Sequence, residues 1–334
     1  MTDLRIEATR GDIVESVHRV SVAVVRMDGR LVAEAGDPTR ITFWRSAAKP
    51  FQALPLLEDG AADALGLTSE ELALACASHS SEPNHLAVAD GFLRRIGATV
   101  DDLACGPHTP ISPAVAERVA REGIALTPLW SNCSGKHAGM LALARHHGWP
   151  MAGYTQPRHP VQGRILAEVA RWTELPAAGI PTATDGCVAV TFALTLTAMA
   201  GAWARFGSAA APGPARLRKA MTGHPELVAG TGRLCTELMA RGRGRVLAKV
   251  GAAGVYCAAL PELGLGLALK VADGDSTAAE QALLAVLRAL LVRAGLDRDD
   301  DFSPIEAHVE RPIANTRGTT VGAVRAAGMP RFHD

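Results

Sequence analysis

The sequence predicts a mixed α/β fold (of α+β type) in which one antiparallel sheet is built from both chain ends and covered by helices. Short apolar runs bounded by glycine, proline or aspartate lie near the N-terminus and again after Arg245. The long middle of the chain alternates polar loops with segments of helical periodicity. We therefore expect a single two-lobed domain over residues 1–334, with a sheet lobe at about 11–45 and 245–330 and an inserted, mainly helical lobe at about 46–244.

The sheet lobe is predicted from strand patterns at both ends. An alternating, β-branched segment followed by Asp28-Gly29 predicts a hairpin over residues 16–35. A long apolar stripe predicts a helix over 277–296, and Arg317-Gly318 is the expected turn of a last strand pair within 313–324. Three further short apolar runs predict strands at 246–250, 255–260 and 265–271.

The helical lobe is predicted to begin just after Ser46. Proline suits the first turn of a helix, so we place Ser46 to Lys49 in the entry turn and start the helix at Pro50, with Pro55 expected to kink or shorten it. The uncharged stretch 186–204 is close to bilayer length, but it lacks flanking aromatic or basic anchors and predicts a buried central helix. Other helices are expected at about 82–96, 114–123 and 138–146.

Composition excludes several classes of function. The chain has 34 basic and 34 acidic residues, so no basic surface for nucleic acid or for an anionic membrane is expected. The first residues carry charges and no apolar run, which argues against a secretory signal and for a cytoplasmic protein. Its six cysteines form no C-x-x-C pair, so we expect no disulfides. Four of them are predicted to be core residues: Cys76, Cys105, Cys235 and Cys257.

A serine and a lysine three residues apart, Ser46 and Lys49, are the first candidate for chemistry. On a helical turn they share a face, where an amine can take the proton of a serine hydroxyl. The spacing alone is common, and an N-cap serine beside a solvated lysine is the alternative. Penicillin-recognising serine hydrolases add a lysine-x-glycine on a strand, which Lys249-Val250-Gly251 matches, and a short polar motif. Two segments compete for that motif, 78–80 and 131–133.

Five blocks of the sequence resemble, in order, those of the rhizobial-type L-asparaginases. That family is the zinc-containing class with a β-lactamase/transpeptidase-like fold, and the resemblance extends from about Gly11 to Val324. The blocks are Ser46-Ala-Ala-Lys-Pro, Cys76-Ala-Ser-His-Ser-Ser-Glu, Ser131-Asn-Cys-Ser-Gly-Lys-His, Thr184-Asp-Gly-Cys and His224-Pro-Glu-Leu-Val-Ala-Gly.

The resemblance implies a set of site residues and a homodimer. It implies two serine-lysine pairs, Ser46 with Lys49 and Ser78 with Lys249, and thereby assigns the polar motif to Ser78. It also implies a zinc site, whose ligands are Cys133, Lys136 and Cys187. Two thiolates suit zinc, and metal binding lowers the pKa of an amine ligand enough for lysine to serve. Val188 follows the last ligand where relatives often carry a polar residue.

The function that the resemblance implies is hydrolysis of L-asparagine to L-aspartate and ammonia. We assign Ser46 as nucleophile with Lys49 as its base, while Ser78 and Lys249 relay a proton. The opposite assignment, with Ser78 attacking, stays open.

Three polar residues near these motifs are candidate substrate contacts. Asp185 suits an α-ammonium group, Arg45 suits an α-carboxylate, and His137 follows the lysine ligand. For each of them, a loop cap or a surface charge is the alternative interpretation.

Two other functions remain as alternatives. The first is a serine hydrolase that acts on another amide or on a β-lactam. The second is a protein without catalysis that binds an amino acid or zinc on the same scaffold; the loss of either serine-lysine pair would have favoured it, and both pairs are intact.

Overall fold

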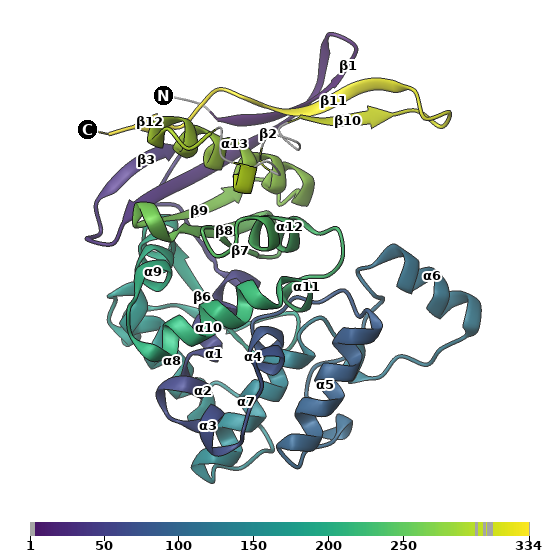
Figure 1. Ribbon diagram of the computed structural model, residues 1–334, viewed down its shortest axis with the longest axis vertical. Helices are drawn as coiled ribbons and strands as arrows, with labels where there is room; N and C mark the ends of the chain where they lie inside the picture. Colours follow the sequence, from purple (N-terminus) through teal and green to yellow (C-terminus); the bar gives the residue numbers. More distant parts are fainter. Residues whose placement is uncertain (1–3, 298–299, 303–304, 306–309, 334) are drawn as a thin grey trace. The chain divides into compact units, whose positions relative to one another are not determined.

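A computed structural model describes residues 4–297, 300–302, 305 and 310–333 (Figure 1). The chain forms two compact units. Unit 1 comprises Met1–Ala47, Leu194–Ser208 and Arg241–Asp334, and unit 2 comprises Ala48–Ala193 and Ala209–Ala240. That the whole chain acts as a single two-lobed domain stays a prediction.

Unit 1 is organised by an antiparallel sheet from both ends of the chain, as predicted. Its strands run in the order β10–β11–β1–β2–β9–β8–β7, and β3 pairs with β2 and β12. In Figure 1 the purple N-terminal strands accordingly lie beside the yellow C-terminal ones. The strands are β1 (Arg5–Arg10), β2 (Ile13–Arg26), β3 (Leu31–Ala35), β7 (Leu247–Val250), β8 (Val255–Leu260), β9 (Leu265–Val271), β10 (Glu310–Ala314), β11 (Thr320–Ala327) and β12 (Arg331–Phe332), and the unit also holds β4 (Ile41–Phe43).

The long strand β2 joins the two parts of this sheet. Its first half pairs with β1, where Arg5 lies opposite Arg19, and its second half pairs with β9, where Val20 lies opposite Val271. The sequence prediction began the sheet at about residue 11 and missed β1. The segment of β1 mixes charged and apolar residues, and its strand conformation comes from pairing with β2 and β11 on its two sides.

Two helices of unit 1 cover strands that are buried along their length. All of β8 and almost all of β9 are buried, which requires cover on both faces, and α9 (Leu196–Ser208) and α13 (Ser276–Ala294) pack on these strands. The backbone of α9 approaches closely at Gly266, where a Cβ would lie 2.0 Å from the carbonyl oxygen of Ala200. The short helices η5 (Pro261–Leu263) and η6 (Asp300–Phe302) complete the unit.

The prediction of one buried helix over 186–204 was wrong in its first half. The chain forms strand β6 (Val190–Thr195) there, paired with β5 (Thr182–Thr184), and turns helical only at Leu196. A short uncharged run carries no periodicity that separates a buried strand from a buried helix. Pairing with β5 makes residues Val190–Thr195 a strand.

Unit 2 is built around α7 (Ser134–His147). Every residue from Ser134 to Ala144 is buried, and the helix packs against α1, α2, α3, α4, α5 and α8. The prediction began this helix at about residue 138, so it placed Lys136 and His137 in a loop; both lie in the first turn of α7 instead.

The chain from Ala48 to Arg241 contains further short and long helices besides α7 and α9. The predicted entry turn at Ser46 and the break at Pro55 are confirmed, since η1 (Arg45–Ala48) leads into α1 and α2 starts at Pro55. The α-helices are α1 (Lys49–Ala53), α2 (Pro55–Glu58), α3 (Ala61–Ala64), α4 (Ser69–Ala75), α5 (Pro83–Arg95), α6 (Pro113–Glu122), α8 (Pro160–Thr173), α10 (Pro212–Gly223), α11 (Pro225–Val228) and α12 (Leu234–Arg241), with η2 (Val100–Asp102), η3 (Pro128–Trp130) and η4 (Ala177–Gly179) as single turns. Among the described residues, no helix is both long enough and apolar enough to span a membrane.

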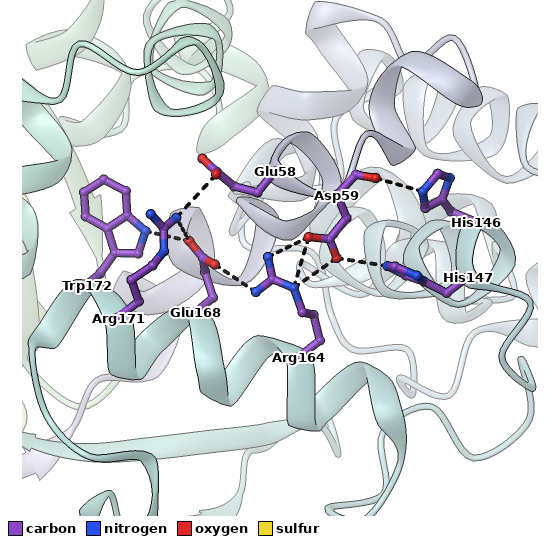
Figure 2. Close-up of polar contacts among 8 residues, drawn as sticks. All are labelled: Glu58, Asp59, His146, His147, Arg164, Glu168, Arg171 and Trp172. Atoms are coloured by element: carbon purple, nitrogen blue, oxygen red, sulfur yellow. Dashed lines mark hydrogen bonds and ion pairs between the residues drawn. The ribbon is translucent and has the colours of Figure 1, made fainter.

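A buried carboxylate of α8 gathers three side chains of the same helix around it (Figure 2). The Glu168 side chain is 1% exposed, and its oxygens accept hydrogen bonds from Arg164 (2.8 Å), from Trp172 Nε1 (2.6 Å) and from Arg171. Bonds to a buried charge of this kind are stabilising because the alternative is an uncompensated carboxylate.

The same network ties α8 to the ends of α2 and α7. Arg164 contacts both oxygens of Asp59, at 2.7 and 3.0 Å, and His147 Nε2 lies 2.9 Å from that carboxylate (Figure 2). His146 Nε2 contacts the Asp59 carbonyl oxygen at 2.9 Å.

Candidate active site

The loop that follows α4 carries Ser78, and the segment around α11 holds it in place. The Ser78 N–H donates to the Val228 carbonyl at 2.9 Å, and the Arg233 guanidinium donates to the Ser78 carbonyl. The Ser80 hydroxyl donates to the Ala229 carbonyl at 3.0 Å. The block 224–230 belongs to the family resemblance, but no role could be predicted for it, because hydrogen bonds to backbone groups do not depend on the types of side chain.

His79 connects the same loop to the start of α7. Its Nδ1 accepts the Ser81 N–H at 3.2 Å, so Nε2 carries the proton of the neutral ring and donates to Ser134 Oγ at 2.8 Å. Burial, together with the nearby His85 ring, holds the pKa of His79 well below its usual range. The two imidazoles stack with centroids 5.2 Å apart. His79 is therefore a neutral structural link between two of the recognised blocks.

Lys49 contacts Ser78. This lysine opens α1, is 1% exposed, and its Nζ donates to Ser78 Oγ at 3.1 Å and to the Ala77 carbonyl. The sequence prediction paired Lys49 with Ser46 and Ser78 with Lys249. Unit 2 by itself thus brings together one lysine and one serine that the prediction had placed in different pairs.

Cys133, Lys136 and Cys187 meet beside this pair. Cys133 is the N-cap residue of α7, Lys136 lies in its first turn, and Cys187 lies in the loop between β5 and β6. Lys136 Nζ is 2.8 Å from Cys187 Sγ, and Cys133 and Cys187 each shift the pKa of the other. The start of α7 and a loop residue 51 positions beyond Lys136 therefore form one sulfur–amine cluster, defined here as Cys133, Lys136 and Cys187.

The three side chains of this cluster shift one another's pKa. A hydrogen bond from Cys187, with the nearby Lys49 and Lys136 amines, holds the pKa of Cys133 well below its usual range despite burial. The same hydrogen bond and burial raise the pKa of Cys187. Burial opposes the charge of Lys136, but the two sulfurs raise the pKa of its amine. These shifts favour loss of a proton at Cys133 and its retention at Cys187 and Lys136.

The first turn of α7 has no room for a side chain at Gly135. A Cβ there would lie 2.3 Å from the Leu74 carbonyl oxygen of α4. The glycine lets α7 approach the backbone of α4, and this approach fixes the turn that carries Cys133 and Lys136.

Three predicted site segments contain a residue with left-handed backbone that is not glycine. Arg45 precedes Ser46 with φ +54°, Ser81 has φ +59°, and Val188 follows Cys187 with φ +65°. A β-branched residue in this region is an outlier, and such strain gathers at functional sites. The other described non-glycine residues with positive φ are Glu174, Arg243 and Ala253.

Comparison with family models identifies the chain. The model described as L-asparaginase II matches residues 6–326. The chain belongs to this family. The resemblance predicted from the sequence blocks is thereby confirmed, and the family is one of amidohydrolases.

Similarity to solved structures is distant. A β-lactamase from Mycobacterium bovis is 14% identical over 82% of this chain and 94% of that chain, with a TM-score of 0.35. Two structures of a protein named Mglu are 18% and 19% identical over 84% of this chain; they are covered over 62% and 68% of their length, with TM-scores of 0.38 and 0.39. No curated protein is significantly similar to the chain in sequence.

Two of the three residues predicted to contact the substrate lie in unit 2. His137 is fully buried in α7, and burial with the charges of Lys136 and Lys49 holds its pKa well below the usual range. Asp185 is half-buried in the loop of Cys187, and its carboxylate raises the pKa of Lys136. Both lie at the sulfur–amine cluster.

Three other predicted site residues of this chain lie in unit 1. Arg45 and Ser46 are half-buried in η1, immediately before α1. Lys249 lies on β7, as predicted, is 0% exposed, and its Nζ donates to the Val250 carbonyl at 3.0 Å. Their roles stay predictions.

The sulfur–amine cluster fits the donor set expected for zinc. Lys136 Nζ and Cys187 Sγ are in contact and Cys133 acts electrostatically on both, and sulfur and nitrogen are ligands that zinc prefers. Within the described part of the chain, no three histidine, cysteine, aspartate or glutamate side chains form a metal-binding group. At the sulfur–amine cluster, Lys136 would be the third protein ligand of a bound metal.

Proposed function

We propose that the chain is an L-asparaginase that hydrolyses L-asparagine to L-aspartate and ammonia. The observation that carries the proposal is the buried Lys49 amine in contact with the Ser78 hydroxyl, within a chain of the L-asparaginase II family. A serine beside an amine is what acyl transfer requires, because the hydroxyl attacks only when a base removes its proton.

The reaction follows from these groups in two steps. The serine oxygen attacks the side-chain amide carbon, its proton passes to the lysine amine, and that proton leaves with the departing ammonia. Water then cleaves the acyl-enzyme: the same lysine accepts the proton of the water and passes it to the leaving serine oxygen, which restores the hydroxyl and releases L-aspartate. In the assignment made from the sequence, Ser46 attacks with Lys49 as its base, and Ser78 with Lys249 relays a proton. In the opposite assignment, which the Lys49–Ser78 contact favours, Ser78 attacks. The experiment below distinguishes the two.

Charged groups are proposed to hold the amino-acid end of the substrate. Asp185 would pair with the α-ammonium and Arg45 with the α-carboxylate, in charge-assisted hydrogen bonds. His137 would donate to a substrate oxygen. These contacts distinguish an amino acid from a simple amide.

We also propose that Cys133, Lys136 and Cys187 hold zinc. A bound zinc ion would supply polarisation of a carbonyl or a water. Cys187, Lys49 and Lys136 lower the pKa of Cys133, which favours the thiolate form that binds a cation. The homodimer and the cytoplasmic location stay predictions.

Ammonia release from L-asparagine tests the proposal. Wild type should release ammonia, and replacement of the nucleophile should lower kcat by about 10⁴-fold or more, since residual catalysis then comes from binding alone. Ser46→Ala and Ser78→Ala are compared with Ser276→Ala, an exposed serine at the start of α13. Full activity in Ser46→Ala with loss in Ser78→Ala would reverse the serine roles. If the wild-type protein released no ammonia from any amide, the proposal that it is an enzyme would be refuted.

Metal analysis tests the zinc proposal independently of activity. Wild type should hold about one zinc per chain, and Cys133→Ser and Cys187→Ser should hold much less. Cys235→Ser is the control, because Cys235 is a buried cysteine of α12 outside the cluster. Equal zinc in all four proteins would contradict the assignment.

A further inference from the structure

A buried hydrogen-bond chain leads from the backbone at Ala104 to His137. The Tyr154 side chain is 1% exposed. Its hydroxyl oxygen accepts the Ala104 N–H at 2.9 Å and lies 2.6 Å from His137 Nδ1, with the two rings edge to face at 78°. The imidazole is therefore oriented by the phenol.

The geometry determines where the protons of this chain lie. A phenol has one proton to donate, and its oxygen already accepts the N–H of Ala104. Among the described residues, His137 Nδ1 is the acceptor that the structure offers to that proton. Nδ1 is then unprotonated, and a neutral imidazole with an accepting Nδ1 carries its own proton on Nε2. A charged ring would place a donor against the phenol and leave the phenolic proton unpaired.

The opposite edge of the ring presents this Nε2–H next to the sulfur–amine cluster. Nε2 is buried and has no hydrogen-bond partner of ordinary geometry in the described chain. Its neighbour in sequence is Lys136, and a contact with the Cys187 backbone acts to raise the pKa of the ring, against the larger effect of burial. A buried N–H whose backbone contact falls short of an ordinary hydrogen bond is incompletely satisfied, so an acceptor atom from a bound molecule would be favoured there.

We propose that Tyr154 is a positioning residue that locks His137 as the Nε2–H tautomer. His137 then donates a hydrogen bond to a carbonyl or carboxylate oxygen of the substrate, and it neither removes a proton nor binds metal. The identity of that acceptor rests on the proposed function, whereas the tautomer does not.

Nitrogen spectroscopy tests the tautomer directly. Long-range ¹H–¹⁵N spectra are recorded on wild type, Tyr154→Phe and Thr173→Val, with His137→Gln to assign the ring. Thr173 carries another buried hydroxyl, bonded to the Val169 carbonyl of its own helix at 2.7 Å. Wild type and Thr173→Val should show pyridine-like Nδ1 and pyrrole-like Nε2, and Tyr154→Phe should show a mixture. A protonated Nδ1 in wild type, or no change in Tyr154→Phe, would overturn the inference.

Kinetics then test what the tautomer is for. Tyr154→Phe should raise KM for L-asparagine about tenfold with a smaller change in kcat, as expected for loss of one hydrogen bond to substrate. Thr173→Val should keep the wild-type KM, and unchanged KM and kcat in Tyr154→Phe would refute the positioning role. If wild type releases no ammonia but shows the expected tautomer, the proposed function fails and the tautomer stands. If ammonia is released and Nδ1 is protonated, only this inference fails.

Discussion

Val188 occupies a backbone position that favours glycine, and this allows a quantitative prediction. In the loop between β5 and β6, the Val188 N–H donates to the Asp185 carbonyl at 2.9 Å and the Asp185 N–H donates to the Ala189 carbonyl at 2.8 Å. This is a turn followed by a left-handed residue, a hairpin geometry in which that residue is usually glycine. Val188 instead has φ +65° and is 42% exposed.

The strain can be isolated by comparing Val188→Ala with Val188→Gly. Both variants lose the same γ-methyl contacts, so their difference reports the backbone. Left-handed backbone costs an L-residue roughly 1–2 kcal/mol. Glycine avoids this cost, but it loses about 0.5–1 kcal/mol more backbone entropy on folding than alanine does. Val188→Gly should therefore be more stable than Val188→Ala by about 0.5–1 kcal/mol, which reverses the usual order of the two residues.

Thermal unfolding measures this difference. A change of 1 kcal/mol shifts Tm by about 2–4 °C in a domain of this size, so the glycine variant should unfold about 2 °C above the alanine variant. Zinc content, measured alongside, reports whether the strained loop is needed to present Cys187. An alanine variant equal to or more stable than the glycine variant would refute the reasoning.

Three further predictions follow from single contacts. Lys49→Met should lower kcat about 10²–10⁴-fold, as expected for loss of a positioned base, with far-ultraviolet circular dichroism unchanged; activity within twofold of wild type would contradict its role. Gly135→Ala should cost about 1–3 kcal/mol in urea unfolding and lower zinc content, because its Cβ would meet the Leu74 carbonyl; an unchanged midpoint would show that α7 can shift. Burial raises the pKa of Asp59, but Arg164 and His147 lower it more, so its contribution to stability should be present above about pH 4 and be lost below that pH. Asp59→Asn should therefore flatten the acid limb of stability against pH, and an unaltered limb would exclude this carboxylate as its source.

The sequence predicted the parts of the fold that depend on local patterns. Glycine and proline mark turns and helix starts through their own backbone limits, so the break at Pro55 and the turn at Gly318 were predictable. The strand β1 and the strand β6 were not, because each takes its conformation from pairing with a distant partner. Local periodicity contains no information about that pairing.

The site shows the same division. By itself the sequence determined the family, because the five blocks and the spacing of Ser46 and Lys49 lie in the order of the residues, and it supplied the candidates for chemistry. Only the tertiary structure decided which of them meet. It placed Lys49 against Ser78, Cys187 beside Lys136 in one sulfur–amine cluster, and Tyr154 on the ring of His137. The physical reason is that these contacts join residues tens of positions apart, and a chain brings such residues together only through the packing of its helices around α7.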